Sequence, residues 1–237
     1  MSLDMLDRLL FSPAIFERFF VEITLLVLNM DNINLAKELY ERFKSIVGTT
    51  QNDNIENSLK LCKALILKQS KSLKTSYKAQ DMMRRLLQST TIAYQNRIET
   101  IKQLCELLLL EYELYQQDEI LKEVQEHIYY LTNIAQEQNL IRLTFESGII
   151  SSKLELLKNN FVKAKQILVG LHDYATSNNL FAYERVMISE ITLLDENYQK
   201  WLGLVESNTS IREIMEKTNI KSYMTNALKQ ITDLEQD

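Results

Sequence analysis

The sequence has few of the residues that interrupt regular secondary structure. Its 237 residues include four glycines and a single proline, Pro13. Folds built from many short strands need turn residues about every ten positions, so this shortage argues against a β-sandwich or a doubly wound sheet. It favours helices joined by short polar loops, in a chain long enough for one continuous helical domain.

The residues that common catalytic and cofactor sites require are also scarce. No two glycines lie within twenty residues of each other, which argues against a glycine-rich phosphate loop. The only histidines, His127 and His172, lack a second histidine or carboxylate at zinc-motif spacing. His172 and Asp173 are adjacent, and neighbours on a helix point about 100° apart, so we expect them to pair poorly. We therefore expect no metal, no cofactor and no catalytic activity.

Charge, hydropathy and cysteine content indicate which partners and which cellular compartment to expect. The formal net charge of -5 argues against a general affinity for nucleic acid or anionic membranes. The most apolar stretch, residues 19–28, is too short to span a bilayer and contains Glu22. The start of the chain lacks the pattern of a secretory signal. Two cysteines, Cys62 and Cys105, fit a reducing compartment, so we expect a cytoplasmic protein.

Apolar residues recur at helical spacing along nearly the whole chain. Ser12 before Pro13, and Ser210 three residues before Glu213, are typical of helix N-termini. Asparagine-rich junctions at 29–34, 51–54, 159–160 and 178–179 indicate turns, because asparagine tolerates the left-handed backbone conformation. The predicted helices cover residues 13–29, 33–47, 55–70, 75–90, 93–116, 119–138, 140–158, 161–177, 180–204, 210–217 and 220–235.

Small residues recur at a nearly constant interval. One helix pair cannot bury its own apolar face and needs a copy to stack on, so a fixed period indicates a helical repeat. In alternate helices, steps of 41 to 43 residues join Phe19, Cys62, Cys105, Gly148 and Ser189. In the helices between them the steps join Ala36, Ala79, Lys122 and Ala164, of which Lys122 breaks the small-residue pattern, while Ala135 and Ala175 are 40 apart. The period is therefore 40 to 43 residues.

The type and spacing of these small residues resemble tetratricopeptide repeats. The resemblance is carried by Leu61-Cys62, Leu104-Cys105, Ser147-Gly148 and the alanines of the intervening helices. The repeats are longer than the family's usual length of about 34, its consensus tryptophan and proline are missing, and Lys122 departs from the pattern. The resemblance implies an all-α fold, a right-handed α-solenoid of antiparallel helix hairpins with about 10 to 11 helices. We expect the array to cover residues 1–204, with capping helices of the same domain in 205–237.

The last predicted helix, residues 220–235, has the pattern of a closing helix. Its apolar residues, among them Ala227 and Ile231, share one face, and terminal repeats need a polar outer face for solubility. A detachable interaction helix is the alternative, because chain ends are often mobile. We expect Trp201 to be buried against the closing helices.

The resemblance also implies a concave groove lined by the first helix of each pair. The partner-binding positions that it implies are Glu56, Lys63, Glu99, Lys102, Glu106, Arg142, Phe145, Tyr183 and Glu190. Such a lining suits an extended or helical peptide, held by charge pairs around apolar anchors, with Phe145 and Tyr183 as the anchors. The alternative is a register one position off, in which the apolar groove positions are simply core: Leu59, Ile66, Phe145 and Val186.

Charge is unevenly distributed along the chain. Between Lys60 and Arg85 there are eight basic residues and one acid, Asp81, whereas between Glu111 and Glu126 there are six acids and one base. Two solvated faces of opposite sign are one interpretation. The other is a basic helix pair that recruits an acidic peptide, an acidic protein or a phosphate-bearing partner.

Three functions are compatible with these observations. A non-catalytic scaffold or adaptor that binds a protein or peptide in its groove follows from the repeat and the missing reactive clusters. A ligand- or peptide-sensing module, like the helical-repeat part of large transcription activators, is the alternative. No basic recognition helix is recognisable, so we expect no direct contact with nucleic acid. An enzyme with an unrecognised site is the third. The sequence leaves homo-oligomerisation open.

Overall fold

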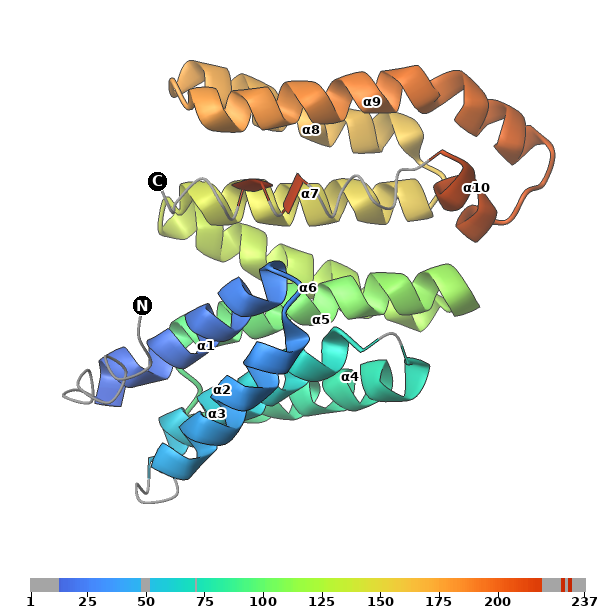
Figure 1. Ribbon diagram of the computed structural model, residues 1–237. Coiled ribbons are helices and arrows are strands. Elements are labelled where there is room, and N and C mark those ends of the chain that lie inside the picture. The colour runs from blue at the N-terminus through green and yellow to red at the C-terminus, as the bar shows by residue number, and fades with distance from the viewer. Residues whose placement is uncertain (1–12, 48–51, 71, 219–226, 229, 232–237) are drawn as a thin grey trace. The chain divides into compact units, whose positions relative to one another are not determined.

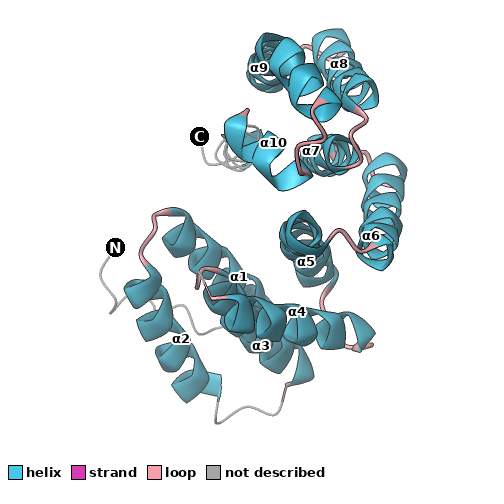
Figure 2. Ribbon diagram, turned by 90° about the vertical axis from the view of Figure 1, so that its right-hand side faces the viewer, coloured by secondary structure: helices cyan, strands magenta, loops and turns pink. Residues whose placement is uncertain are grey.

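Helices and the turns between them make up the computed structural model in its described residues, 13–47, 52–70, 72–218, 227–228 and 230–231 (Figures 1 and 2). No strand occurs in these ranges, which confirms the all-α prediction for them. Predicted and observed helix ends differ by at most two residues. The helices are α1 Pro13–Asn29, α2 Ile33–Val47, α3 Asp53–Lys68, α4 Leu73–Gln88, α5 Tyr94–Tyr115, α6 Asp118–Glu137, α7 Ile141–Leu157, α8 Phe161–Ser177, α9 Phe181–Glu206 and α10 Ile211–Lys217.

Five turns between helices share one geometry. In each, a residue with φ between 52° and 58° is followed by a residue whose N–H donates to a carbonyl five positions earlier. This is the Schellman arrangement, which satisfies carbonyls at a helix C-terminus. The left-handed residues are Asp31, Asn139, Asn159, Asn179 and Asn208. The prediction that asparagine-rich junctions form turns is therefore confirmed at residues 159 and 179.

Polar side chains cap several helix N-termini. The Asn52 Oδ1 atom accepts from the Asn54 N–H at 3.0 Å, at the start of α3. The predicted cap at Ser210 is confirmed, since its hydroxyl oxygen accepts from the Glu213 N–H at 3.4 Å. The predicted cap at Ser12 lies outside the described residues. These caps satisfy N–H groups that have no partner within the helix.

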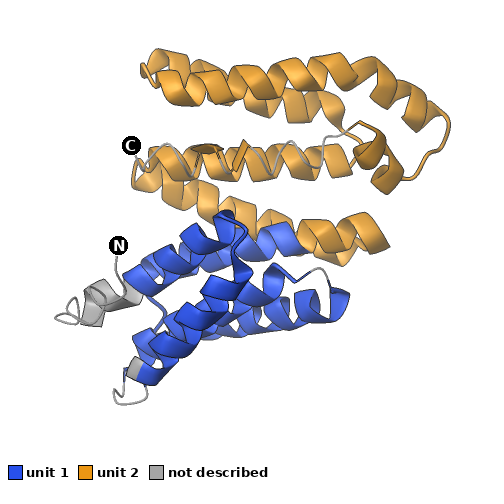
Figure 3. Ribbon diagram, in the orientation of Figure 1, with its two compact units in different colours: residues 1–107 blue, residues 108–237 orange. Residues whose placement is uncertain are grey.

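The chain divides into two compact units, residues 1–107 and 108–237 (Figure 3). In the first unit, α1 packs on α2 and α3, α2 packs on α3, and α3 packs on α4. The Phe20 and Phe43 rings stack with centroids 3.8 Å apart. Cys62 and Cys105 are both completely buried, as expected for small residues where helices approach closely.

The second unit contains the C-terminal part of α5 and helices α6 to α10. Its helices pack in chain order, α6 on α7, α7 on α8, α8 on α9, and α10 on α9. Helix α7 is enclosed on most sides, because twelve of its 17 residues are buried. Trp201 is 1% exposed, which confirms its predicted burial, and its ring lies 5.7 Å from that of Phe161.

The helix spacing follows the predicted period with one exception. Helices α1, α3, α5, α7 and α9 begin 40, 41, 47 and 40 residues apart. The long interval follows α5, which has 22 residues. Four small second-helix residues are completely buried, namely Ala36, Ala79, Ala164 and Ala175. Ser189 is exposed, whereas Met187 and Glu190 beside it are buried, so the 41-residue step misses the buried face of α9.

The end of the chain is described only in part. The eleventh predicted helix, residues 220–235, lies mostly outside the described residues. Within it, Ala227 and Ile231 are completely buried and Gln230 is exposed. These four-residue neighbours therefore share a buried face, as the amphipathic pattern predicts.

Candidate partner-binding site

Three of the predicted groove residues belong to one polar network in the first unit. The Lys102 ammonium lies 3.0 Å from a Glu99 carboxylate oxygen. The Gln103 amide donates to Glu99 at 2.7 Å. Lys68 of α3 reaches across to Gln103 and to Glu106 of α5. These charges are already partnered within the unit, and Lys102 is only 8% exposed. The network therefore links α3 to α5, and its charges are poorly available to a binding partner.

Two other predicted groove residues of the first unit are solvent-exposed. Glu56 lies 3.9 Å from Lys60, in an exposed pair one helical turn apart. Lys63 is exposed and makes no ion pair with any residue that the structure describes. Of the five predicted groove residues in this unit, Lys63 is therefore the most available to a partner.

In the second unit the predicted apolar anchor is part of the core. Phe145 is completely buried, and its ring stacks on that of Tyr183 with centroids 4.5 Å apart. A partner cannot contact Phe145 without displacing its neighbours, so its role as an anchor on an open groove is corrected here. The alternative core assignment holds for all of its positions, since the buried residues include Leu59, Ile66, Phe145 and Val186.

Of the remaining predicted groove residues of the second unit, Arg142 is half-buried and Glu190 is buried. Arg142 pairs with Glu146 at 2.9 Å, and Glu146 is 3% exposed. Glu190 of α9 is 4% exposed. The sequence interpretation missed Glu146, although its position four residues after Arg142 is the spacing of a helical ion pair.

A second charged pair in this unit was also missed. Lys153 of α7 lies 3.8 Å from Glu113 of α5, and both residues are buried. They are 40 residues apart in the sequence, so no local pattern indicates their pairing. A charge pair this deep is a structural element, because replacing either residue removes a charge that its buried partner faces.

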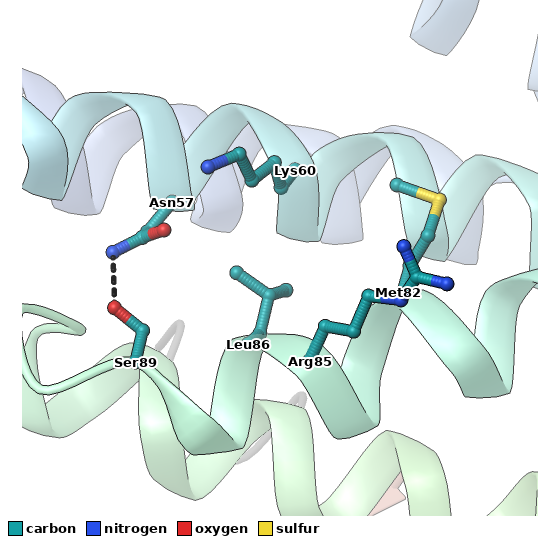
Figure 4. A pocket seen from close by; sticks show the side chains of 6 residues that line it. All are labelled: Asn57, Lys60, Met82, Arg85, Leu86 and Ser89. Carbon is teal, nitrogen blue, oxygen red and sulfur yellow. Dashed lines mark hydrogen bonds between the residues drawn. The ribbon is translucent and has the colours of Figure 1, made fainter.

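An open pocket with charged residues in its wall lies between α3 and α4. Its volume is about 360 Å³, and its lining consists of Asn57, Lys60, Met82, Arg85, Leu86 and Ser89. Figure 4 shows Lys60 projecting from one helix, with Met82, Arg85 and Leu86 on the other. Apolar side chains therefore form part of the wall and two cations stand beside them. Such a mixed site suits a ligand that combines an apolar group with negative charge.

One end of this pocket is fixed by hydrogen bonds. The Asn57 amide donates to the Ser89 hydroxyl at 3.1 Å (Figure 4). It also donates to the Thr91 hydroxyl at 3.1 Å. The Arg97 guanidinium donates to the Ser89 carbonyl at 2.8 Å. The turn after α4 is thus tied to α3 and to α5, which holds the pocket's end in place without a partner.

Exposed cations are frequent on α3 and α4, and two of them, Lys60 and Arg85, line the pocket. We call Lys60, Lys63, Lys74, Lys78 and Arg85 the basic surface, and all five are exposed. Lys63, Lys74 and Lys78 make no ion pair with a described residue. Arg85 pairs with Asp81 at 2.9 Å, but its side chain is 75% exposed. The sequence predicted this concentration of charge, whereas the pocket depends on how the two helices pack.

Other reactive groups do not gather into a comparable site. His172 Nδ1 lies 3.4 Å from Asp173 Oδ1, a long contact at the surface, in keeping with the expectation that these neighbours pair poorly. No group of three metal-ligating side chains occurs among the described residues. Within the same residues, no helix combines the length and apolarity that crossing a membrane requires.

The cysteines are inert in this structure. Cys62 and Cys105 are free and buried. Burial raises the pKa of the Cys62 thiol from 9.0 to about 12, despite a hydrogen bond with Thr24 that acts to lower it. A thiol with so high a pKa is protonated at neutral pH and is a poor nucleophile.

Comparisons of this chain with protein-family models, curated proteins and solved structures give no match. Any functional inference therefore rests on the geometry of the described residues.

Proposed function

We propose that this chain is a non-catalytic scaffold or adaptor that binds a protein or peptide partner. We further propose that its helices form a tetratricopeptide-like, right-handed α-solenoid of antiparallel hairpins. Support for the architecture comes from the short Schellman turns, the packing of helices in chain order, and the buried pair Cys62 and Cys105 one period apart. The two free thiols are consistent with a cytoplasmic location.

The observation that carries the binding function is the basic surface with its pocket. Three of its lysines have no ion-pair partner among the described residues, and the pocket is lined by Met82 and Leu86 beside Lys60 and Arg85. Surface lysines attract an acidic partner over a long range, whereas the apolar wall supplies short-range contact. The partner that fits is an acidic segment with at least one bulky apolar side chain.

The basic surface lies only partly within the predicted groove. The predicted groove residues Glu99, Lys102 and Glu106 are engaged with one another and with Lys68, and Phe145 is buried. Lys63 belongs to both the predicted groove and the basic surface. A partner in the predicted groove and a partner on the basic surface would therefore both contact Lys63.

Selection of peptides from a random library on the immobilised whole chain tests the proposal. We expect enrichment of peptides with several Asp or Glu residues around a Leu, Met or aromatic residue. The variant with Lys60→Glu, Lys63→Glu and Arg85→Glu should lose at least about tenfold in affinity for them, a difference of about 1.4 kcal/mol.

The matched control has Lys37→Glu and Lys44→Glu on α2, where both lysines are exposed. We expect its affinity for the selected peptides to stay within about twofold of the original. Failure to enrich any peptide, or enrichment of peptides whose binding ignores the reversed charges, would count against this function.

A further inference from the structure

We propose that the basic surface of one copy of this chain binds the exposed face of α6 in a second copy. The inference rests on the proposed function, since it uses the same surface and names its partner. It is carried by the charge and spacing of two surfaces that belong to different units of the same chain.

The exposed face of α6 has a net negative charge, because Glu119 and Glu126 stand on either side of a single exposed cation, Lys122. Helix α6 contains five acidic residues and one lysine. Glu119 and Glu126 are exposed, and neither makes an ion pair with a described residue. They stand seven residues apart, so they lie on the same side of the helix two turns from each other.

An exposed aromatic side chain continues this acidic face. Tyr129 follows Glu126 by three residues and is 70% exposed, among the highest values for a large side chain in the described residues. Residues three apart on a helix are surface neighbours. Tyrosine is enriched at protein interfaces, because its ring buries much area at little conformational cost. We call Glu119, Glu126 and Tyr129 the acidic face.

The two surfaces match in spacing as well as in charge. Lys78 and Arg85 of α4 are also seven residues apart, which is about 10.5 Å along a helix, as for Glu119 and Glu126. With α4 and α6 of two copies side by side in parallel, Lys78 meets Glu119 and Arg85 meets Glu126.

In that alignment Tyr129 falls one turn beyond Arg85. The pocket residues Leu86 and Ser89 lie there, so the ring enters the pocket while the two carboxylates meet the cations. Arg85 retains donors for this contact, because Asp81 engages only its Nε and one terminal nitrogen. A guanidinium has five N–H donors in all.

The contact is heterologous, since each copy contributes a different surface. A pair of copies therefore keeps one unused basic surface and one unused acidic face, to which further copies can bind. Because the charges are exposed, salt should weaken the association.

Sedimentation velocity of the whole chain tests this. At about 0.05 M salt we expect the average mass to rise above that of a monomer as concentration increases to about 1 mM, and to fall back at about 0.5 M salt. The variant with Lys78→Glu and Arg85→Glu should lower the association constant at least about tenfold, and so should the variant with Glu119→Lys and Glu126→Lys. The control with Lys37→Glu and Lys44→Glu reverses two exposed lysines at the same seven-residue spacing and should associate normally.

A mixture of the two charge-reversed variants separates this contact from general charge effects. One variant keeps the acidic face and the other keeps the basic surface, so the mixture should form a one-to-one dimer that does not grow. Tyr129→Ala changes no charge, and we expect it also to weaken association at least about threefold, which keeps the test valid if a charge-reversed chain fails to fold.

Some outcomes would overturn the inference. A chain that stays monomeric at every concentration and salt level would do so, as would association that neither variant pair affects. If the chain is monomeric while acidic peptides still bind the basic surface, only the second-copy partner is wrong. If the peptides fail as well, the proposed function fails with it.

Discussion

A Cβ atom on Gly148 would lie 2.6 Å from Cδ1 of Leu171, so α7 and α8 meet at this glycine with no space for a side chain. Cδ2 and Cγ of the same leucine would be at 3.0 Å and 3.2 Å. The whole end of Leu171, rather than a single methyl group, fills the site. Gly170 of α8 is the opposite case, since nothing lies within 4 Å of a Cβ placed there.

The first prediction compares these two glycines. Gly148→Ala should lower the free energy of unfolding by about 1 kcal/mol, because overpacking costs about 1–3 kcal/mol and the gain in helix propensity offsets part of it. Gly170→Ala should raise it by about 0.5–1 kcal/mol. Urea denaturation followed by circular dichroism measures both. Equal effects of the two substitutions would show that the contact with Leu171 does not limit the site.

The second prediction concerns the left-handed turn residue Asn179, whose φ is 56°. Asn179→Ala should lower the free energy of unfolding by about 1 kcal/mol, because a Cβ disfavours this conformation and alanine has no polar side chain to compensate. Asn179→Gly should change it by less than about 0.5 kcal/mol. Thermal and urea unfolding of the two variants measure these changes in the free energy of unfolding. If alanine and glycine behaved alike, backbone conformation would not be the reason for asparagine here.

The third prediction concerns the buried thiol. The pKa of Cys62 is raised to about 12 in the folded chain from an ordinary value of 9.0, so the unfolded chain loses this proton first. The contribution to stability is complete below about pH 9 and is lost as pH rises toward 12, by up to about 1.4 kcal/mol per pH unit. Unfolding free energies measured at several values of pH above 8 should fall more steeply for the original chain than for Cys62→Ala. Parallel pH profiles would contradict this.

The fourth prediction contrasts a buried with an exposed ion pair. Lys153→Met should cost about 3 kcal/mol, because the Glu113 side chain, 2% exposed, loses a nearby positive charge. Lys165→Met should cost less than about 1 kcal/mol, since its partner Asp195 is 50% exposed.

Chemical denaturation of both variants tests the contrast. Adding Glu113→Gln to Lys153→Met should recover part of the lost stability, because it removes the buried negative charge that Lys153 faces. No recovery, or equal costs for the buried and exposed lysines, would mean that burial does not govern the strength of these pairs.

Local chemistry explains why the helices could be predicted so closely from the sequence. The bounds of α1, α2 and α8 match the prediction at both ends. Their ends depend on residues within a few positions, such as Asn159 with its left-handed φ and Asn160, whose side chain caps α8. Signals of this kind are visible in a single sequence.

The face that each helix presents could not be predicted in the same way. Helix α7 is buried on most sides, so its apolar pattern does not show which side is the groove, and Phe145 was assigned to the wrong one. The pocket depends on side chains from α3 and α4, such as Asn57 and Leu86, that are distant in the sequence. Their proximity follows from packing between helices, which periodicity within one helix does not specify.

The Schellman turns also bear on how the chain acquires its structure. Because most of the packed helix pairs are neighbours in the chain or next but one, most loops that must close are short, and their entropic cost is small. Chains dominated by such local contacts fold rapidly. We expect residues 1–107 to fold while the ribosome is still synthesising residues 108–237. Little apolar surface of the first unit would then stay exposed during synthesis.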